Sequence, residues 1–168
     1  MTPLLARGGA ILLLVGGTVG CDAVTKHMAM ESLAGSPAQS FLGDTIRLTY
    51  AENAGGFLSF GASLPEWART HVFTVSVGFV LLMLALLAWR SGWQRWRTAA
   101  FALFIAGGTS NWVDRLGDGR VVDFLNLGIG GLRTGIFNVA DMAIMLGAAL
   151  FLFAEYRASV DRRKEQRS

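Results

Sequence analysis

The sequence predicts an all-α membrane protein with four transmembrane helices and a small sheet between helices 1 and 2. Three observations indicate this fold class. Hydrophobic residues make up 52% of the 168-residue chain and gather in four long runs. Basic and acidic residues are separated between alternate connecting segments. A chain of this length is too short to enclose four fully apolar helices in soluble layers, so we expect these helices to lie in lipid.

Each apolar run has the length of a membrane-spanning helix. A helix needs ~20 residues to cross a hydrocarbon layer of ~30 Å. The runs lie near residues 8–27, 67–89, 98–116 and 137–154. We expect one membrane-embedded domain over residues 1–168, which ends in a basic tail at 157–168.

The charged residues indicate how the helices cross the membrane. Nine of the 15 Lys and Arg precede the first run, link the second to the third, or follow the fourth. The positive-inside rule places these segments, and therefore both termini, in the cytoplasm. Nine of the 12 acidic residues fall in the outer half. Topology and lipid headgroups explain the basic tail, so we expect no nucleic-acid partner.

The two outer connections differ in composition. Within the long segment near 28–66, residues 45–50 alternate apolar and polar side chains at strand period, which predicts a small sheet on the outer membrane surface. The second outer segment, near 117–136, carries six glycines. We expect it to be a mobile or tightly turned loop.

Cysteine and histidine are too few for a disulfide or a clustered metal site. The chain has one cysteine, Cys21, and its two histidines, His27 and His71, lie in different segments. We expect no metal site. Arg7, the first apolar run and Cys21 together look like a lipoprotein signal peptide, but three further apolar runs follow Cys21.

Two polar clusters flank the first outer segment. Asp22 and Lys26 are spaced i and i+4, so they can pair on one helix face, as a structural ion pair or to shape a site. Asn53 precedes Gly55 and Gly56 and forms either a simple turn or an amide aimed at a peptide backbone.

A third cluster ends the third apolar run. Asn111, Asp114 and Arg115 share one helix face by their spacing. We expect Asp114 to stay ionised as the partner of Arg115, because an adjacent cation lowers a carboxylate pKa. Arg115 could bind an anionic headgroup or a peptide carbonyl.

The fourth cluster contains two aspartates in apolar surroundings. Asp123 lies between apolar residues, and Asp141 lies about one turn inside the fourth run with Asn138 on the same face. Two close carboxylates cannot both ionise easily, so one can act as a base on water while the other acts as an acid. The alternative is one helix-capping Asp and one buried polar contact.

Two other functions use the same residues. A small membrane cation transporter could use Asp22, Asp114 and Asp141, but no polar path is visible through the middle of the runs. A Ser/Lys peptidase could use Lys26, although Lys26 would stay protonated beside Asp22.

The motifs, in order, resemble the bacterial lipoprotein signal peptidases, or signal peptidase II. The resemblance covers about residues 5–157 and rests on five short motifs. These are Asp22 with Thr25-Lys26; Asn53 with Gly55 and Phe57; Gly107-Gly108 with Asn111 and Asp114-Arg115; Val122-Asp123-Phe124; and Phe137-Asn138 with Ala140-Asp141.

The resemblance implies a membrane-embedded aspartic endopeptidase that has no metal or organic cofactor and a small periplasmic β-cradle between helices 1 and 2. Such an enzyme removes the signal peptide from diacylglyceryl-modified prolipoproteins, immediately before the lipidated cysteine. We expect this prolipoprotein and membrane lipids to be the partners of a monomeric chain in the bacterial inner membrane, with its active site near the periplasmic face. The catalytic residues implied are Asp123 and Asp141. The residues implied to bind substrate or shape the site are Asp22, Lys26, Asn53, Asn111, Asp114, Arg115 and Asn138.

The sequence departs from the family pattern at two positions. Only Gly56 lies between Gly55 and Phe57, where family members often have two small residues, and Ser110 stands where many have glycine before Asn111. These departures bear on loop geometry and substrate preference, and they leave both aspartates in place.

Overall fold

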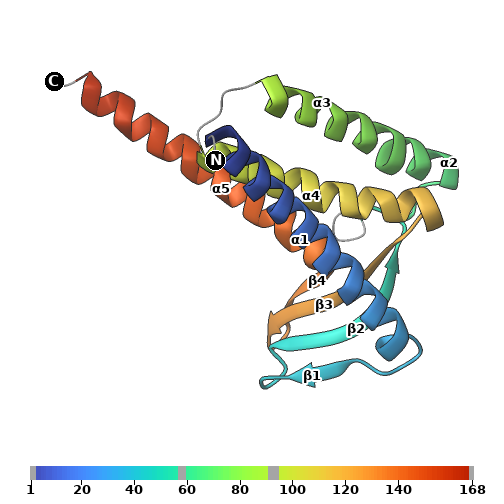
Figure 1. Cartoon of the computed structure of the whole chain (residues 1–168). Helices are drawn as coiled ribbons and strands as arrows, with labels where there is room; N and C mark the ends of the chain where they lie inside the picture. The colour runs from blue at the N-terminus through green and yellow to red at the C-terminus, as the bar shows by residue number, and fades with distance from the viewer. Residues whose placement is uncertain (1–2, 57–59, 91–94, 167–168) are drawn as a thin grey trace.

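The computed structural model describes residues 3–56, 60–90 and 95–166. Its helices form one body, and a small sheet lies at one end of it (Figure 1). The elements follow the order α1 (Pro3–Leu33), β1 (Gln39–Phe41), β2 (Ile46–Asn53), α2 (Glu66–Arg69), η2 (Thr70–Ser76), α3 (Val77–Arg90), α4 (Arg95–Asp118), β3 (Val121–Ile129), β4 (Leu132–Phe137) and α5 (Val139–Glu165).

The first three predicted apolar runs fall within helices, and the fourth lies in α5 except for Phe137, which ends β4, and Asn138, the N-cap. By length and composition, two stretches among the described residues could cross a membrane, Glu66–Ala88 and Val139–Glu165. The first of these begins with α2 and the π-helical η2 and continues into α3, and the second is α5. Helix α5 continues through the basic residues from Arg157 to Lys164 and ends at Glu165.

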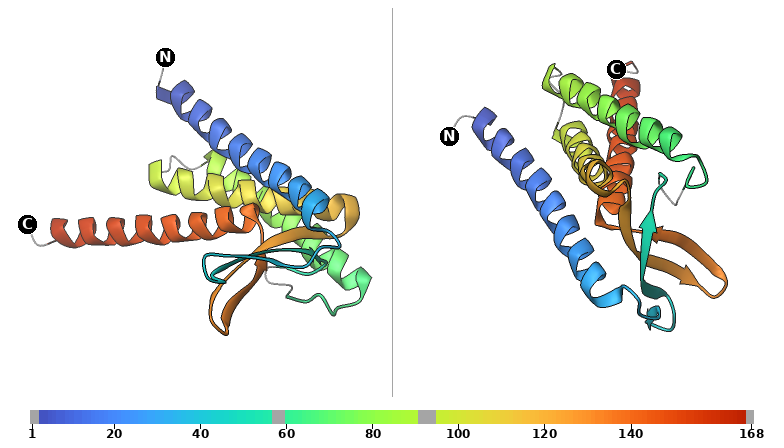
Figure 2. Two further views of the ribbon diagram at one scale, coloured as in Figure 1. Left: turned by 90° about the horizontal axis from the view of Figure 1, so that it is seen from below. Right: turned by 90° about the vertical axis from the view of Figure 1, so that its right-hand side faces the viewer.

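Helices α4 and α5 pack closely because small residues line their contact. A Cβ atom on Gly147 of α5 would lie 2.7 Å from the backbone oxygen of Ala100, and one on Gly107 of α4 would collide with the backbone oxygen of Ala140. Glycine at these positions lets the two backbones approach. Both views in Figure 2 show the N-terminal end of α1 lying apart from these helices. The contacts of α1 with α4 and α5 described below come from its C-terminal half.

The sheet is larger than the sequence predicted. The strand predicted at residues 45–50 is confirmed as part of β2. The segment near 117–136 is tightly turned, one of the two forms expected, but it is not a loop, because β3 and β4 form a hairpin there and extend an antiparallel sheet of order β1-β2-β3-β4. The expected cradle between the first two helices therefore takes half of its strands from the segment between α4 and α5.

The glycines that suggested a loop instead make the hairpin turn. Ile129 pairs with Leu132, so Gly130 and Gly131 form a two-residue turn, and Gly130 has a positive φ of 58°. Such turns favour glycine because the backbone enters the left-handed region. This hairpin carries Asp123 to a place beside the start of α5.

Candidate active site

Asp123 lies on β3 with its carboxyl group held by two amides. The residue is 2% exposed. Its Oδ2 accepts a hydrogen bond from Nδ2 of Asn53 at 2.8 Å, and its Oδ1 accepts one from Nδ2 of Asn138 at 2.7 Å. Asn53 is opposite Val121 in the antiparallel pairing of β2 with β3, and this register brings its side chain beside Asp123.

Asp141 lies in the first turn of α5 and helps to cap that helix. The backbone N–H of Asp141 donates to Oδ1 of Asn138 at 2.9 Å, and the backbone N–H of Asn138 donates to Oδ2 of Asp141 at 3.3 Å. This reciprocal capping box fixes where α5 begins. The other carboxylate oxygen of Asp141 accepts from Nδ2 of Asn111 at 2.9 Å.

Asn138 joins the two aspartates into one network. It is fully buried. Its amide nitrogen donates to Asp123 at 2.7 Å and to Oδ1 of Asn111 at 3.2 Å, while its side-chain oxygen and backbone N–H bind Asp141. The same asparagine therefore binds Asp123 on a strand and Asp141 on a helix.

Lys26 supplies the buried positive charge next to this network. Its Nζ lies 2.5 Å from Oδ2 of Asp22 and 2.6 Å from Oδ2 of Asp114, and it donates to Oδ1 of Asn111 at 2.8 Å. These three acceptors match the three donors of an ammonium group. Lys26 therefore links α1 to α4 and orients the amide of Asn111 toward Asp141.

The expected pairing of Asp114 with Arg115 is wrong. Asp114 is bound by Lys26, while Arg115 donates from Nη2 to the backbone oxygen of Gly55 at 2.5 Å and from Nη1 to that of Asn111 at 3.1 Å. Adjacent residues on a helix point in different directions, so sequence neighbours need not pair. The Nε of Arg115 is buried and has no hydrogen-bond partner within the described part of the chain.

The surroundings favour a protonated form of Asp123. Burial raises the pKa of Asp123 to about 6, against the hydrogen bond from Asn53, and the negative charge of Asp141 adds to the rise. This value lies close to the range in which a carboxyl group can both accept and donate a proton at neutral pH.

A cavity adjoins the site on the side of Arg115. It has a volume of about 160 Å³ and is lined by Ala54, Glu66, Arg69, Phe73, Arg115, Asp118 and Arg120, among others. The volume is large enough for several water molecules. Ala54, which lines the cavity, directly follows Asn53 in the chain.

The sequence match identifies the family to which these residues belong. The family described as "Signal peptidase (SPase) II" matches residues 13–157. This chain belongs to the signal peptidase II family. It is therefore a protease, and an aspartic mechanism is consistent with the family. The alternative of a small cation transporter is not supported.

Known relatives of this signal peptidase II agree in sequence and fold. The chain is 32% identical over 156 residues to the lipoprotein signal peptidase of Salmonella typhi, covering 89% of this chain and 90% of the relative. It is 34% identical over 115 residues to that of Yersinia enterocolitica, covering 68% of each.

Two solved structures share the fold. Both are described as bacterial membrane enzymes determined by the in meso method. One has a TM-score of 0.78 at 23% identity over 91% of each chain, and the other has a TM-score of 0.76 at 24% identity over 87% of this chain and 92% of the other.

The structure brings every predicted site residue of this signal peptidase II into one connected set. The predicted Phe57 lies outside the described residues. One member was not predicted: Ser110, which is 6% exposed, donates from Oγ to Oδ2 of Asp22 at 2.7 Å. Its spacing of four residues from Asp114 places it on the same helix face, and that spacing could have identified it.

Proposed function

We propose that this signal peptidase II removes the signal peptide from diacylglyceryl-modified prolipoproteins, cutting immediately before the lipidated cysteine, with Asp123 and Asp141 as its catalytic residues. The observation that carries the proposal is the binding of both carboxyl groups by Asn138. The substrate class follows the relatives, which are named lipoprotein signal peptidases.

The chemistry needs one proton shared by the two carboxyl groups. The ionised carboxylate takes a proton from a water molecule as that water attacks the scissile carbonyl carbon, and the protonated carboxyl group donates its proton to the carbonyl oxygen. A pKa of about 6 for Asp123 suits such a pair near neutral pH. The proton belongs to the pair, whose two apparent pKa values describe both groups together.

The surrounding polar residues position the two aspartates and the substrate. Asn53, Asn111 and Asn138 orient the carboxyl groups by direct hydrogen bonds. Asp22, Lys26 and Asp114 hold α1, α4 and α5 together behind them. We assign to Arg115 a contact with a backbone carbonyl of the bound peptide, since its Nε has no partner in the described residues and it lines the adjoining cavity.

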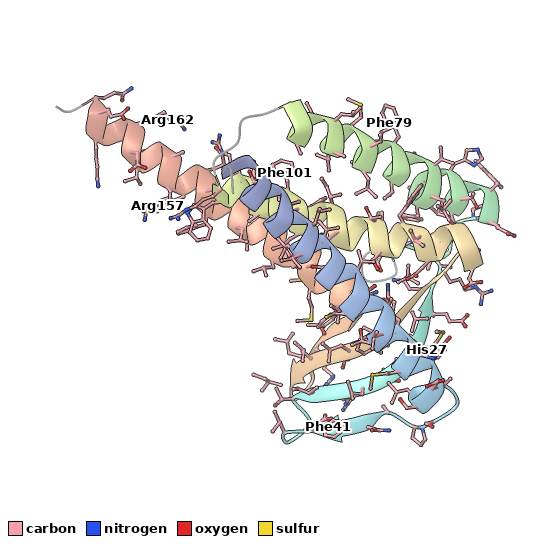
Figure 3. The ribbon with its side chains drawn as sticks, viewed as in Figure 1. His27, Phe41, Phe79, Phe101, Arg157 and Arg162 are labelled. Atoms are coloured by element: carbon pink, nitrogen blue, oxygen red, sulfur yellow. The ribbon has the colours of Figure 1, made fainter. Side chains whose placement is uncertain are left out.

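We infer that the chain crosses the bacterial inner membrane four times as one monomeric domain over residues 1–168. The spans are α1, the continuous stretch from α2 to α3, α4, and α5, with both termini in the cytoplasm and the site near the periplasmic face. Figure 3 supports this orientation: Arg157 and Arg162 lie on the part of α5 remote from the sheet, while His27 and Phe41 lie beside or on the sheet. Positive charge on the remote end agrees with a cytoplasmic location.

The free end of the sheet is apolar, which suggests contact with membrane lipids. Leu42, Ile129 and Leu132 are 77%, 81% and 84% exposed. They flank two turns at the same end, since Gly128 donates to the backbone oxygen of Thr45 at 2.9 Å. Large exposed apolar side chains of this kind mark interaction surfaces, and lipid is the partner next to a membrane-embedded site.

Spin labels test this contact directly. In a Cys21→Ser background, which removes the single cysteine, a label at Leu132→Cys in lipid vesicles should be relaxed more by oxygen than by a water-soluble nickel complex. A control label at Gln39→Cys, an exposed position on β1, should show the reverse. Equal accessibility of both labels to the water-soluble nickel complex would contradict the proposed lipid contact.

The proposed function is tested by cleavage with the purified protein. A diacylglyceryl-modified precursor should be cut once, and mass spectrometry should place the new N-terminus at the lipidated cysteine. The matched control is the same precursor without the lipid, which should be cut at least tenfold more slowly, on the order expected for lost substrate contacts. Cleavage elsewhere, or no preference for the lipid, would contradict the proposed substrate.

A further inference from the structure

The carboxylate of Asp22 is completely enclosed and receives donors from three helices. Asp22 is 0% exposed. Its Oδ2 lies 2.5 Å from Nζ of Lys26 on α1 and accepts a hydrogen bond from Oγ of Ser110 on α4 at 2.7 Å. Its Oδ1 accepts from the backbone N–H of Ala140 on α5 at 2.8 Å. Burying a carboxylate is costly unless hydrogen-bond donors satisfy it, and these donors do so for Asp22.

Two series of contacts connect Asp22 with Asp141. One is the backbone: the N–H that it accepts belongs to Ala140, the residue immediately before Asp141. The other passes through side chains, since Lys26 donates to Asn111 at 2.8 Å and Asn111 donates to Asp141 at 2.9 Å. The position of the Asp22 carboxylate therefore affects both the backbone and the carboxyl group of Asp141.

Lys26 and Ser110 both donate to Oδ2 of Asp22, so the Ser110 hydroxyl affects how strongly Lys26 is held there. With the hydroxyl present, Lys26 can divide its three N–H groups between Asp22, Asp114 and Asn111. Without it, Lys26 is the remaining donor to Oδ2 in the described residues. The ammonium is then drawn toward Asp22 and away from Asn111, because a buried carboxylate attracts charge more strongly than an amide oxygen does.

We propose that Ser110 is a positioning residue for Asp141, acting through the buried carboxylate of Asp22. The proposal rests on the proposed function, because it concerns the same site. Ser110 contacts neither aspartate of the pair. Its hydroxyl donates a hydrogen bond to the carboxylate of Asp22. Lys26 can then also donate to Asn111 and hold it in the orientation that binds Asp141.

Ser110→Ala tests the hydroxyl, and Thr109→Ala is the matched control. Thr109 is the neighbouring residue on α4 and lines the apolar groove between α3 and α4. With a diacylated precursor, Ser110→Ala should lower kcat about tenfold, the size expected for one hydrogen bond to a charged group. KM should change less than about twofold, since the hydroxyl is not expected to meet substrate. Thr109→Ala should match the wild type.

Two further variants separate positioning from packing. Ser110→Gly makes a larger hole than alanine does, and a water molecule can occupy it and donate to Asp22. Its kcat should therefore be at least that of Ser110→Ala, whereas a packing role would make glycine worse. In an Asp22→Asn background, Ser110→Ala should have little further effect on kcat, because the two residues act as a unit.

The outcomes are distinguishable from a failure of the proposed function. If the wild type cuts the precursor and Ser110→Ala has the same kcat, the positioning role is wrong while the proposed function stands. A tenfold loss that persists in the Asp22→Asn background, or a kcat for glycine well below that for alanine, also overturns it. If the wild type does not cut the lipidated precursor, the proposed function and this inference both fall.

Discussion

The protein contains two small clusters of charged side chains that use similar groups for different purposes. In the buried cluster, Lys26 lies between Asp22 and Asp114. In the exposed cluster, Asp44 lies between Arg47 and Arg133. The side chains of Asp22 and Lys26 are 0% and 5% exposed, whereas those of Asp44 and Arg47 are 38% and 40% exposed.

The difference in burial decides what each cluster can do. Asp44 has a positive φ of 70° in the turn between β1 and β2, and its bonds to Arg47 and Ser40 hold that turn. Solvent screens such a pair, so it adds little to stability. In the buried cluster, Asp22 and Lys26 are shielded from water and each requires its partners, although the side chain of Asp114 is 32% exposed. We therefore expect only the buried cluster to transmit a change in one side chain to the proposed catalytic pair, Asp123 and Asp141.

Removal of the buried cation should have the largest effect. Lys26→Met leaves Asp22 and Asp114 without their shared partner, and uncompensated buried charge destabilises a protein by about 3–5 kcal/mol. We expect thermal unfolding in detergent at a much lower temperature and loss of cleavage. The control is Lys164→Met, which changes the only other lysine, at the exposed end of α5. Equal melting of the two variants would mean that the buried cluster is not what holds α1 to α4.

The pH dependence of stability should differ in sign between Asp123 and Asp44. The pKa of Asp123 is raised to about 6, so the folded state binds its proton more tightly and stability falls as pH rises from about 4 to about 6. The fall is on the order of 2–3 kcal/mol at 1.36 kcal/mol per unit of pKa. Hydrogen bonds from Arg47 and then Ser40 hold the pKa of Asp44 well below its usual range, so its contribution is lost as pH falls below about 4.

Thermal unfolding across pH 3 to 8 measures both effects. Asp123→Asn should flatten the decline between pH 4 and pH 6. If Asp123→Asn follows the wild-type curve throughout, burial does not perturb Asp123 as described.

Disruption of the exposed cluster should have the smallest effect. Arg47→Gln removes the strongest partner of Asp44, but Arg133 still donates to the backbone oxygen of Asp44 at 2.7 Å. We expect cleavage to match the wild type and any change in melting temperature to disappear in 0.5 M salt, because screening already weakens exposed pairs. A loss of activity that persists in high salt would show that the turn between β1 and β2 is coupled to the site.

The sequence predicted the elements that depend on local pattern. The four apolar runs are helical apart from the first two residues of the fourth, residues 46–50 form part of a strand, and Asp141 lies in the first turn of its helix. Each of these follows from spacing along a few turns or one strand. The family motifs added the assignment of the site residues, and the structure places those residues in one network.

The sequence did not predict the features that depend on how distant segments meet. Asp114 was expected to pair with its neighbour Arg115, yet its partner is Lys26 on another helix. The glycines near 117–136 indicated a loop because a hairpin there gains its stability from pairing with β2, which no local pattern shows. Ser110 was predicted only as a departure from the family pattern, because its hydrogen bond to Asp22 joins α4 to α1.

The most direct test of the catalytic pair compares three aspartate variants in one assay. Asp123→Asn and Asp141→Asn each remove a group that must exchange a proton, while Asp161→Asn changes an exposed aspartate on the same helix as Asp141. All three should insert into membranes as the wild type does. We predict that a diacylated precursor is cut at the wild-type rate by Asp161→Asn and not detectably by the other two. Wild-type cleavage by either Asp123→Asn or Asp141→Asn would contradict it.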